Sequence, residues 1–192
     1  MRTIETCLPG VIVFEPRRFG DARGFFVETF QVERYAAAGI PGPFIQDNLS
    51  RSSYGVLRGL HLQYPNSQGK LVSVLRGAVL DVAVDVRVGS PTFGKSVTVE
   101  LSEENGHQMF VPRGFAHGFV VLSEMADFFY KCDGQYSPTD EIAVRWCDPA
   151  LDIDWRIANP NVSVRDASAP LLSEIHCLPQ YEGPVCASLS LA

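Results

Sequence analysis

The chain has 192 residues, of which 46% are hydrophobic and 20% are charged, and its formal net charge is −6. This composition argues against a disordered chain, and the length allows one sizeable hydrophobic core. The acidic balance disfavours nucleic acid as a partner, because an extended phosphate backbone requires a basic face, although a few local arginines could still hold one diphosphate.

No segment of the sequence indicates export or membrane insertion. The first residues lack a continuous apolar run, and the longest run elsewhere covers only residues 119–122. We therefore expect a cytoplasmic protein that does not contact membranes. The cysteines form no C-x-x-C pair and are odd in number, which favours free thiols over a disulfide framework. They are Cys7, Cys132, Cys147, Cys177 and Cys186.

Short β-branched and aromatic segments alternate with turn signals along the chain, a pattern typical of an all-β sandwich or barrel. The predicted strands, in chain order, are residues 11–14, 25–30, 44–48, 56–64, 71–75, 78–86, 97–101, 108–111, 119–122, 127–131 and 142–146. A short helix is predicted at residues 32–38, ended by Gly39 and Pro41. From Ser173 onward we expect a loosely attached tail.

Residues 78–86 form the clearest predicted strand, with Leu80, Val82 and Val84 on one face. Asp81 and Asp85 share the other face. Two aspartates on one face of an apolar strand predict that this face meets polar partners or water.

Residues 56–64 pose a problem of direction, because strict alternation would place Arg58 and His61 on opposite faces. A site that used both needs them to converge, and Gly59 between them is suited to a β-bulge that re-aims the strand. A lone strand histidine is more often a hydrogen-bonded core imidazole. A second segment of this kind carries His117, and the chain has only four histidines. Together they indicate a polar cavity in which an imidazole serves as a base near neutral pH.

The motif Pro-x-Gly-x-x-His at residues 112–117 resembles the second motif of the cupin superfamily, whose fold is a double-stranded β-helix, or jelly-roll barrel, here with a few short helices. In metal-binding cupins the first motif carries His-x-His followed by Glu. Here His61 is followed by Gln63 instead of a second histidine, and no glutamate follows before Glu100. A transition-metal site usually needs three or four imidazole, thiolate or carboxylate ligands. We therefore expect no metal and no other cofactor.

Further motifs, taken together, resemble the dTDP-4-dehydrorhamnose 3,5-epimerase family from about residue 5 to residue 172. They are Phe19-Gly-Asp21-x-Arg23-Gly24-Phe25-Phe26-x-Glu28, Gln46-Asp-Asn48, Leu57-Arg-Gly-Leu-His61-x-Gln63, Gln68-Gly-Lys70-Leu-Val, Asp81-Val-Ala-Val-Asp85, Ser90-Pro-Thr-Phe-Gly94, Pro112-x-Gly-Phe-Ala-His117-Gly-Phe and Phe129-Tyr-Lys131. Each motif is weak alone, and their order and number make the resemblance specific. It implies one cupin-like epimerase domain over residues 1–172, and it supplies no role for residues 173–192.

The resemblance implies that the chain epimerises dTDP-4-dehydro-6-deoxy-D-glucose at C3 and C5, in dTDP-L-rhamnose biosynthesis. Both carbons flank the C4 ketone, so a base can remove a proton to give an enolate, and reprotonation from the other face inverts the centre. By resemblance His61 is the base and Tyr130 is the acid across the ring. Asp166 would fix the tautomer of His61, and Lys70 would face the developing charge on the C4 oxygen. Asp81 is a lesser candidate for the role of Asp166.

The resemblance also implies the substrate contacts. Side chains that match diphosphate contacts are Arg23, Arg58 and Arg165, the last standing where relatives often have lysine. Side chains that match nucleotide or sugar contacts are Phe19, Glu28, Gln46, Asp47, Asn48, His117, Tyr136 and Glu141. In this family the segment with Arg23 and Glu28 crosses to the partner subunit. We therefore expect a homodimer with sites completed across the interface.

Three alternatives stay open. The first is an epimerase of one centre only, C3 or C5, in another dTDP-4-keto-deoxysugar pathway, which the presence of Tyr130 disfavours. The second is a metal-dependent cupin oxygenase, which Gln63 and the missing glutamate disfavour. The third is a non-catalytic sugar-nucleotide binding module, which would require neither His61 nor Tyr130.

Overall fold

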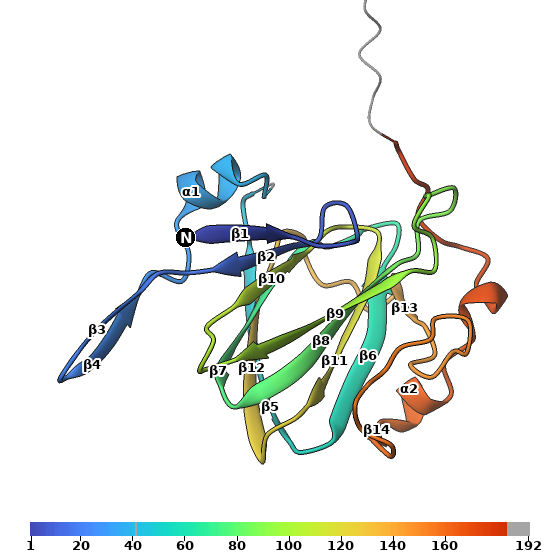
Figure 1. The fold of residues 1–192 in the computed structure, drawn as a ribbon. Coiled ribbons are helices and arrows are strands. Elements are labelled where there is room, and N and C mark those ends of the chain that lie inside the picture. The colour runs from blue at the N-terminus through green and yellow to red at the C-terminus, as the bar shows by residue number, and fades with distance from the viewer. Residues whose placement is uncertain (41, 184–192) are drawn as a thin grey trace, which may run out of the picture.

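Most of the strands lie in two sheets that face each other (Figure 1). The structure, a computed structural model, describes residues 1–40 and 42–183. The first sheet has the order β1 (Arg2–Glu5), β2 (Ile12–Glu15), β10 (Gln108–Val111), β7 (Lys70–Arg76), β12 (Met125–Cys132) and β5 (Gln46–Ser53). The second has the order β13 (Glu141–Ala143), β6 (Val56–Gln63), β11 (Phe115–Val121), β8 (Ala78–Asp85) and β9 (Ser96–Ser102), and β14 (Asn161–Val162) pairs in parallel with β6. The predicted all-β fold is confirmed.

The predicted strands all appear, and the differences concern their ends and the shortest elements. β11 begins four residues earlier than predicted, and β5 runs five residues further. Helix α1 (Val32–Ala37) is the predicted helix, and Gly39, with φ of 88°, follows its end. The elements that the sequence did not predict are β1, β3 (Arg18–Asp21), β14, α2 (Val164–Ala167) and a 3-10 helix at Leu172–Glu174. They are short, and several are rich in charged residues.

β8 is buried on both faces, which explains its dense apolar composition. Val79 and Ala83 point between the two sheets, where side chains of both sheets form the largest core cluster. The alternate residues pack under the C-terminal segment on the outer face of the second sheet. Asp81 and Asp85 both find polar partners, as predicted. Those partners are His117 for Asp81, and Arg87, Ser90 and Thr92 for Asp85.

The C-terminal segment covers the outer face of the second sheet with Trp155, Leu172 and Leu178, all buried. A parallel bridge joins Val88 to Gln180. Residues 173–183 are therefore attached to the barrel and not loose, while residues 184–192, including Pro184 and Cys186, lie outside the described residues. The other cysteines are free, as predicted. No helix in the described ranges is long and apolar enough to cross a membrane.

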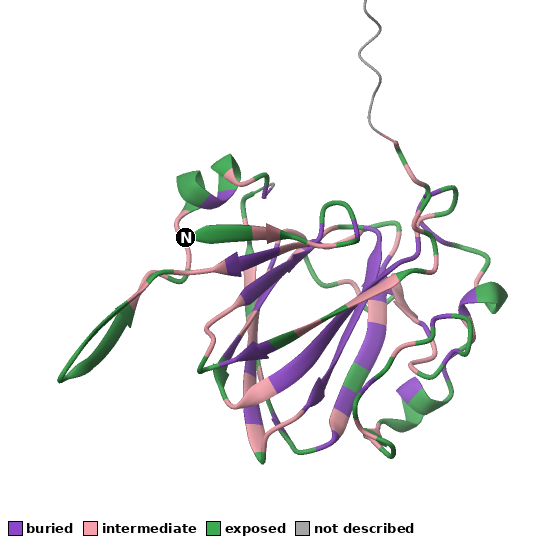
Figure 2. Cartoon of the chain, in the orientation of Figure 1, coloured by how far each residue is buried: buried purple, intermediate pink, exposed green. Residues whose placement is uncertain are grey.

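Strands β3 and β4 (Gly24–Val27) form a hairpin that projects away from the barrel (Figure 1). Figure 2 shows that this hairpin is exposed, whereas the central strands of the second sheet are buried along most of their length. Three phenylalanines of the hairpin, Phe19, Phe25 and Phe26, have exposed fractions of 52%, 62% and 69%. Such exposure of aromatic side chains in one arm marks a surface that favours contact with another protein chain.

Candidate active site

A cavity of about 490 Å³ lies between the two sheets. Its lining residues are Ser50, Val56, Leu57, Arg58, His61, Lys70, His117, Gly118, Phe119, Phe128, Tyr130, Asn161, Val162, Ser163, Arg165 and Asp166. A narrower cavity of about 100 Å³ shares His61, Lys70 and Tyr130 with it. The four side chains expected to do the chemistry, His61, Lys70, Tyr130 and Asp166, therefore line one continuous space.

Arg58 and His61 both line this cavity because β6 contains an extra residue between them. His117 pairs with His61 and Phe119 pairs with Arg58, so three steps along β6 match two steps along β11. This is the bulge predicted from Gly59. At Gly59 φ is 127°, and a Cβ atom would lie 2.6 Å from the Cα of Gly118. Only glycine fits this close approach of the two strands.

His61 forms a close pair with Asp166, with 2.6 Å between His61 Nε2 and Asp166 Oδ1. Ser163 places Asp166 by capping α2, because its hydroxyl oxygen accepts a hydrogen bond from the Asp166 amide. Burial favours a higher pKa for Asp166, but His61, Ser163 and the Gly59 amide outweigh it and hold that pKa below its ordinary value. The carboxylate therefore accepts the Nε2 proton and leaves the lone pair on Nδ1 of His61.

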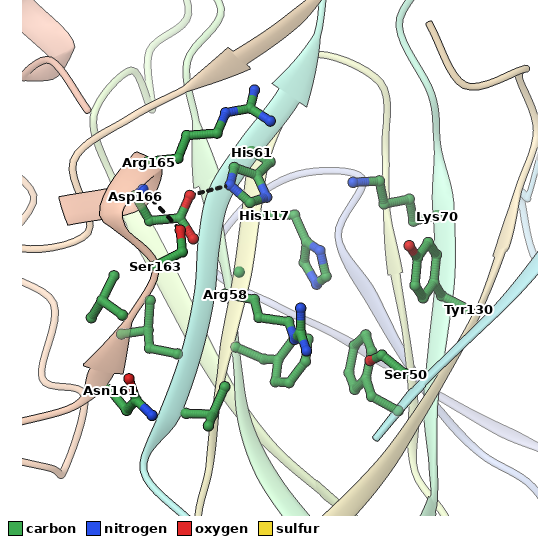
Figure 3. Close-up of a pocket in the computed structure, with 16 residues that line it drawn as sticks. Ser50, Arg58, His61, Lys70, His117, Tyr130, Asn161, Ser163, Arg165 and Asp166 are labelled. Atoms are coloured by element: carbon green, nitrogen blue, oxygen red, sulfur yellow. Dashed lines mark hydrogen bonds and ion pairs between the residues drawn. The ribbon is translucent and has the colours of Figure 1, made fainter. Parts of the chain in front are cut away.

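Lys70 and Tyr130 reach the same cavity from the first sheet, opposite His61 (Figure 3). Burial lowers the pKa of Lys70, while nearby Cys132, Glu141 and Asp81 oppose this shift. No described residue forms an ion pair with Lys70, so its charge is open to a ligand. Burial raises the pKa of Tyr130, so the phenol keeps its proton at neutral pH and can donate it.

His117 lies in the cavity wall between His61 and Tyr130 (Figure 3). Its Nε2 is 2.9 Å from Asp81 Oδ1, and its ring stacks on Phe128 with 6.1 Å between the centroids. Asp81 therefore contacts His117 and not His61, which removes it as the alternative orienting partner of His61.

The other expected substrate contacts of the barrel line one of the two cavities, except Asp47. Arg165 pairs with Glu141 at 2.6 Å, and the Tyr136 hydroxyl donates to the same carboxylate at 3.1 Å. Gln46, Asn48, Tyr136 and Glu141 line the narrower cavity. Asp47 does not line either cavity, because alternation along β5 turns it to the outer face, where it pairs with Lys131 at 2.9 Å.

The remaining expected contacts do not reach the cavity of their own chain. Phe19 and Arg23 belong to the projecting hairpin, where Arg23 pairs with Asp21. Glu28 follows the hairpin and pairs with Arg34 of α1 at 3.4 Å. None of the three lines either cavity.

The sequence did not single out several lining residues, among them Ser50, Phe119, Phe128, Asn161 and Ser163. The hydroxyl of Ser163 was detectable as a helix-cap signal two positions before Arg165. The two phenylalanines stack at 4.1 Å and are core residues as well as lining residues, so nothing in the sequence separates these roles.

Gln63 stands where metal-binding cupins have a second histidine, and its side chain forms hydrogen bonds with the backbone of two neighbouring loops. Its amide group donates to the carbonyls of Asn66 and Gln135, and its oxygen accepts from the Ser137 amide. Among the residues that the structure describes, no group of three or more His, Cys, Asp or Glu side chains is arranged to hold a metal ion.

Comparisons with known proteins show which family the chain is similar to. The model of the family described as dTDP-4-dehydrorhamnose 3,5-epimerase matches residues 5–174. A dTDP-4-dehydrorhamnose 3,5-epimerase from Pseudomonas aeruginosa is 50% identical over 93% of this chain and 100% of that protein. The crystal structure of the dTDP-6-deoxy-D-glucose-3,5-epimerase from Legionella pneumophila, in complex with dTDP-4-keto-L-rhamnose, superposes with a TM-score of 0.93 at 52% identity, covering 95% of this chain and 99% of that chain.

A less similar structure bears on the number of centres inverted. A 3'-monoepimerase from Streptomyces bikiniensis, in complex with dTDP-quinovose, has a TM-score of 0.86 at 36% identity and covers 92% of each chain. An enzyme whose name states that it inverts a single centre therefore shares this fold, so the fold alone does not decide how many centres are inverted.

Proposed function

The chain belongs to the dTDP-4-dehydrorhamnose 3,5-epimerase family, and from this membership we propose that it epimerises dTDP-4-dehydro-6-deoxy-D-glucose at C3 and C5. The enzyme is then an isomerase of the route to dTDP-L-rhamnose. Relatives that are 50% and 49% identical over 93% and 91% of this chain carry this name. The expected location in the cytoplasm stays a prediction.

One observation supports the proposal most strongly. His61 lies on β6 of the second sheet and is paired with Asp166 of α2, while Lys70 and Tyr130 face His61 across the same cavity from the first sheet. Inversion at carbon needs a base on one face of the sugar ring and an acid on the other. A cavity walled by two opposed sheets supplies both.

In the proposed reaction Nδ1 of His61 takes the proton from the carbon beside the ketone. The electron pair of the broken C–H bond moves into the ring, and the C4 oxygen becomes an enolate oxygen. Asp166 stabilises the imidazolium that forms, and the Lys70 ammonium stabilises the enolate. The Tyr130 hydroxyl then donates its proton to the same carbon from the opposite face. His61 then releases its proton to solvent and Tyr130 takes one up before the second centre reacts. No cofactor takes part.

Epimerisation in heavy water tests this function directly. The wild-type protein and dTDP-4-keto-6-deoxyglucose are incubated in D₂O, and NMR locates the deuterium. We expect label at both C3 and C5 of an inverted sugar. Label at one carbon only would support the single-centre alternative, for which the similarity to the 3'-monoepimerase speaks. No label would indicate a binding module and contradict the proposal.

Replacement of Tyr130 by phenylalanine is expected to separate deprotonation from inversion. The Tyr130→Phe variant keeps the ring but loses the proton donor on the first sheet, while His61 and Asp166 are untouched. We expect the rate of formation of the deuterium-labelled epimer to fall by more than about 10²-fold, which is the lower end of the range for a positioned acid. Exchange at carbon without inversion should continue. An unchanged rate and an unchanged product ratio in the NMR assay would remove Tyr130 from the role of acid.

We also propose that the protein is a homodimer in which the β3–β4 hairpin completes the site of the partner subunit. Phe19, Arg23 and Glu28 are expected substrate contacts that lie outside the cavity of their own chain, and the hairpin exposes aromatic side chains. In a symmetric dimer the same arm of each subunit reaches the other.

Mixing two defective variants tests this exchange of arms. His61→Ala has no base, and Arg23→Ala lacks a predicted diphosphate contact. A hybrid dimer contains one site with both wild-type residues, so random mixing should restore roughly a quarter of the wild-type activity. The mixture is refolded or co-expressed and compared with each variant alone. Activity equal to the mean of the two separate variants would show that Arg23 does not act across subunits.

A further inference from the structure

A second buried pair of histidine and carboxylate lies in the cavity wall, next to the pair of His61 and Asp166. Asp81 of β8 and His117 of β11 belong to adjacent strands, and 2.9 Å separates Asp81 Oδ1 from His117 Nε2. Their side chains have exposed fractions of 0% and 7%. The mechanism above gives this pair no role, although His117 lines the cavity between His61 and Tyr130.

The Asp81 carboxyl makes few hydrogen bonds with the described residues. Its Oδ2 atom is buried and has no hydrogen-bond partner among the described residues. A buried polar atom without a partner is destabilising, and such atoms concentrate at functional sites. Burial raises the pKa of Asp81, and the opposing effects of His117 and Lys70 reduce that rise without cancelling it. Its single hydrogen bond, within the described part of the chain, goes to the ring of His117.

That hydrogen bond decides which nitrogen of His117 carries the proton. With Asp81 ionised, the carboxylate can only accept a hydrogen bond, so a proton on Nε2 of His117 points to Asp81 and the lone pair is on Nδ1. No described residue makes a hydrogen bond with Nδ1. The ring of His117 stacks on Phe128 and lines the cavity, so Asp81 and Phe128 constrain its position on two sides.

We propose that Asp81 is a positioning residue that keeps the His117 proton on Nε2, so that Nδ1 accepts a hydrogen bond from a hydroxyl of the sugar ring. This inference rests on the proposed function, because it assumes a sugar in the cavity. The hydroxyl held in this way fixes the ring between His61 and Tyr130. A misplaced ring loses rate at both centres, because proton transfer requires close alignment.

The tautomer can be measured without a variant and without turnover. In protein labelled with ¹⁵N at histidine, the two ring nitrogens have different chemical shifts, and His117→Gln identifies the signals of His117. We expect the proton on Nε2 of His117. A proton on Nδ1 would overturn the inference, whether or not the wild-type protein epimerises its substrate. Failure of the proposed function would appear separately, as absence of wild-type turnover.

Kinetics of Asp81 variants then test the consequence. Asp81→Ala should mix the two tautomers of His117 and lower kcat by roughly 10²-fold, the effect of a small displacement of reacting groups, with less change in KM. Asp81→Asn keeps an acceptor oxygen in place and should restore the Nε2 tautomer and part of kcat. Asp81→Ala should add no loss in a His117→Ala background. If the kcat reductions of Asp81→Ala and His117→Ala multiply in the double variant, Asp81 does not act through His117. The same conclusion follows if Asp81→Asn is as slow as Asp81→Ala.

Asp85 offers a matched control on the same strand. It is equally buried, but its partners are Arg87, Ser90 and Thr92, which do not line the cavity. Asp85→Ala should lower stability to thermal unfolding and leave the His117 tautomer and kcat unchanged. A change in the tautomer with this variant would attribute the effect of Asp81→Ala to general loosening of the strand.

Discussion

Replacement of His61 by alanine is expected to lower kcat by about 10²- to 10⁴-fold, the range for a positioned base. In the proposed reaction His61 supplies the lone pair that accepts the substrate proton, and the hydrogen bond with Asp166 holds its other nitrogen. His117 is not expected to replace it, because its Nδ1 is proposed to hold a hydroxyl of the sugar ring. Deuterium exchange at C3 and C5 should be lost together.

Binding and a control separate this effect from misfolding. Isothermal titration calorimetry with dTDP should give a Kd close to that of the wild type, because His61 lies in the part of the cavity that receives the sugar. His176→Ala removes an exposed histidine of the C-terminal segment and should keep full activity. If His61→Ala retains more than a tenth of the wild-type exchange rate, His61 is not the base.

The second large effect is expected for Lys70→Ala, which should lower kcat by about 10²- to 10³-fold and change KM much less. Lys70 forms no ion pair with any described residue, so its charge can act on the enolate oxygen as it develops. A contact used only in the transition state lowers kcat and kcat/KM together. Lys95→Ala removes an equal charge from an exposed turn and should have no effect. A rise in KM with unchanged kcat would instead assign Lys70 to ground-state binding.

The pH profile supplies an independent readout of the same residue. Burial lowers the pKa of Lys70, so the ammonium loses its proton at a lower pH than a solvated lysine does. The charged form exists below that pKa, and kcat of the wild type should therefore fall as pH rises through it. This alkaline limb should be absent from the Lys70→Ala profile. A limb of equal position in both proteins would belong to another group.

The strands could be predicted from the sequence because each has at least one face that packs in the core, which gives the residues of that face a consistent apolar character. Residues 78–86 show this best, since one face is apolar along the whole strand and the other alternates apolar side chains with Asp81 and Asp85. β1 and β3 were missed because Arg2–Glu5 and Arg18–Asp21 contain charged residues on exposed strands. Their pairing comes from the neighbouring strand, so local composition carries no signal.

The candidate site likewise contains features that the local sequence predicts and features that it does not. Alternation and Gly59 were sufficient to predict that Arg58 and His61 converge. The contact between His61 and Asp166 joins residues 105 positions apart, through a helix of only four residues. No spacing rule predicts such a pair, and it came from the resemblance alone. Asp47 shows the reverse, because the motif suggested a substrate contact and alternation along β5 places the side chain on the outer face.

The central claim is that His61 and Tyr130 act on opposite faces of one sugar ring. A crystal structure of this chain with dTDP-4-keto-L-rhamnose bound tests it most directly. We predict that Nδ1 of His61 faces C3 and C5 from one side, the Tyr130 hydroxyl faces them from the other, and Lys70 Nζ lies within hydrogen-bond distance of the C4 oxygen. A complex with both side chains on the same face of the ring would contradict the account.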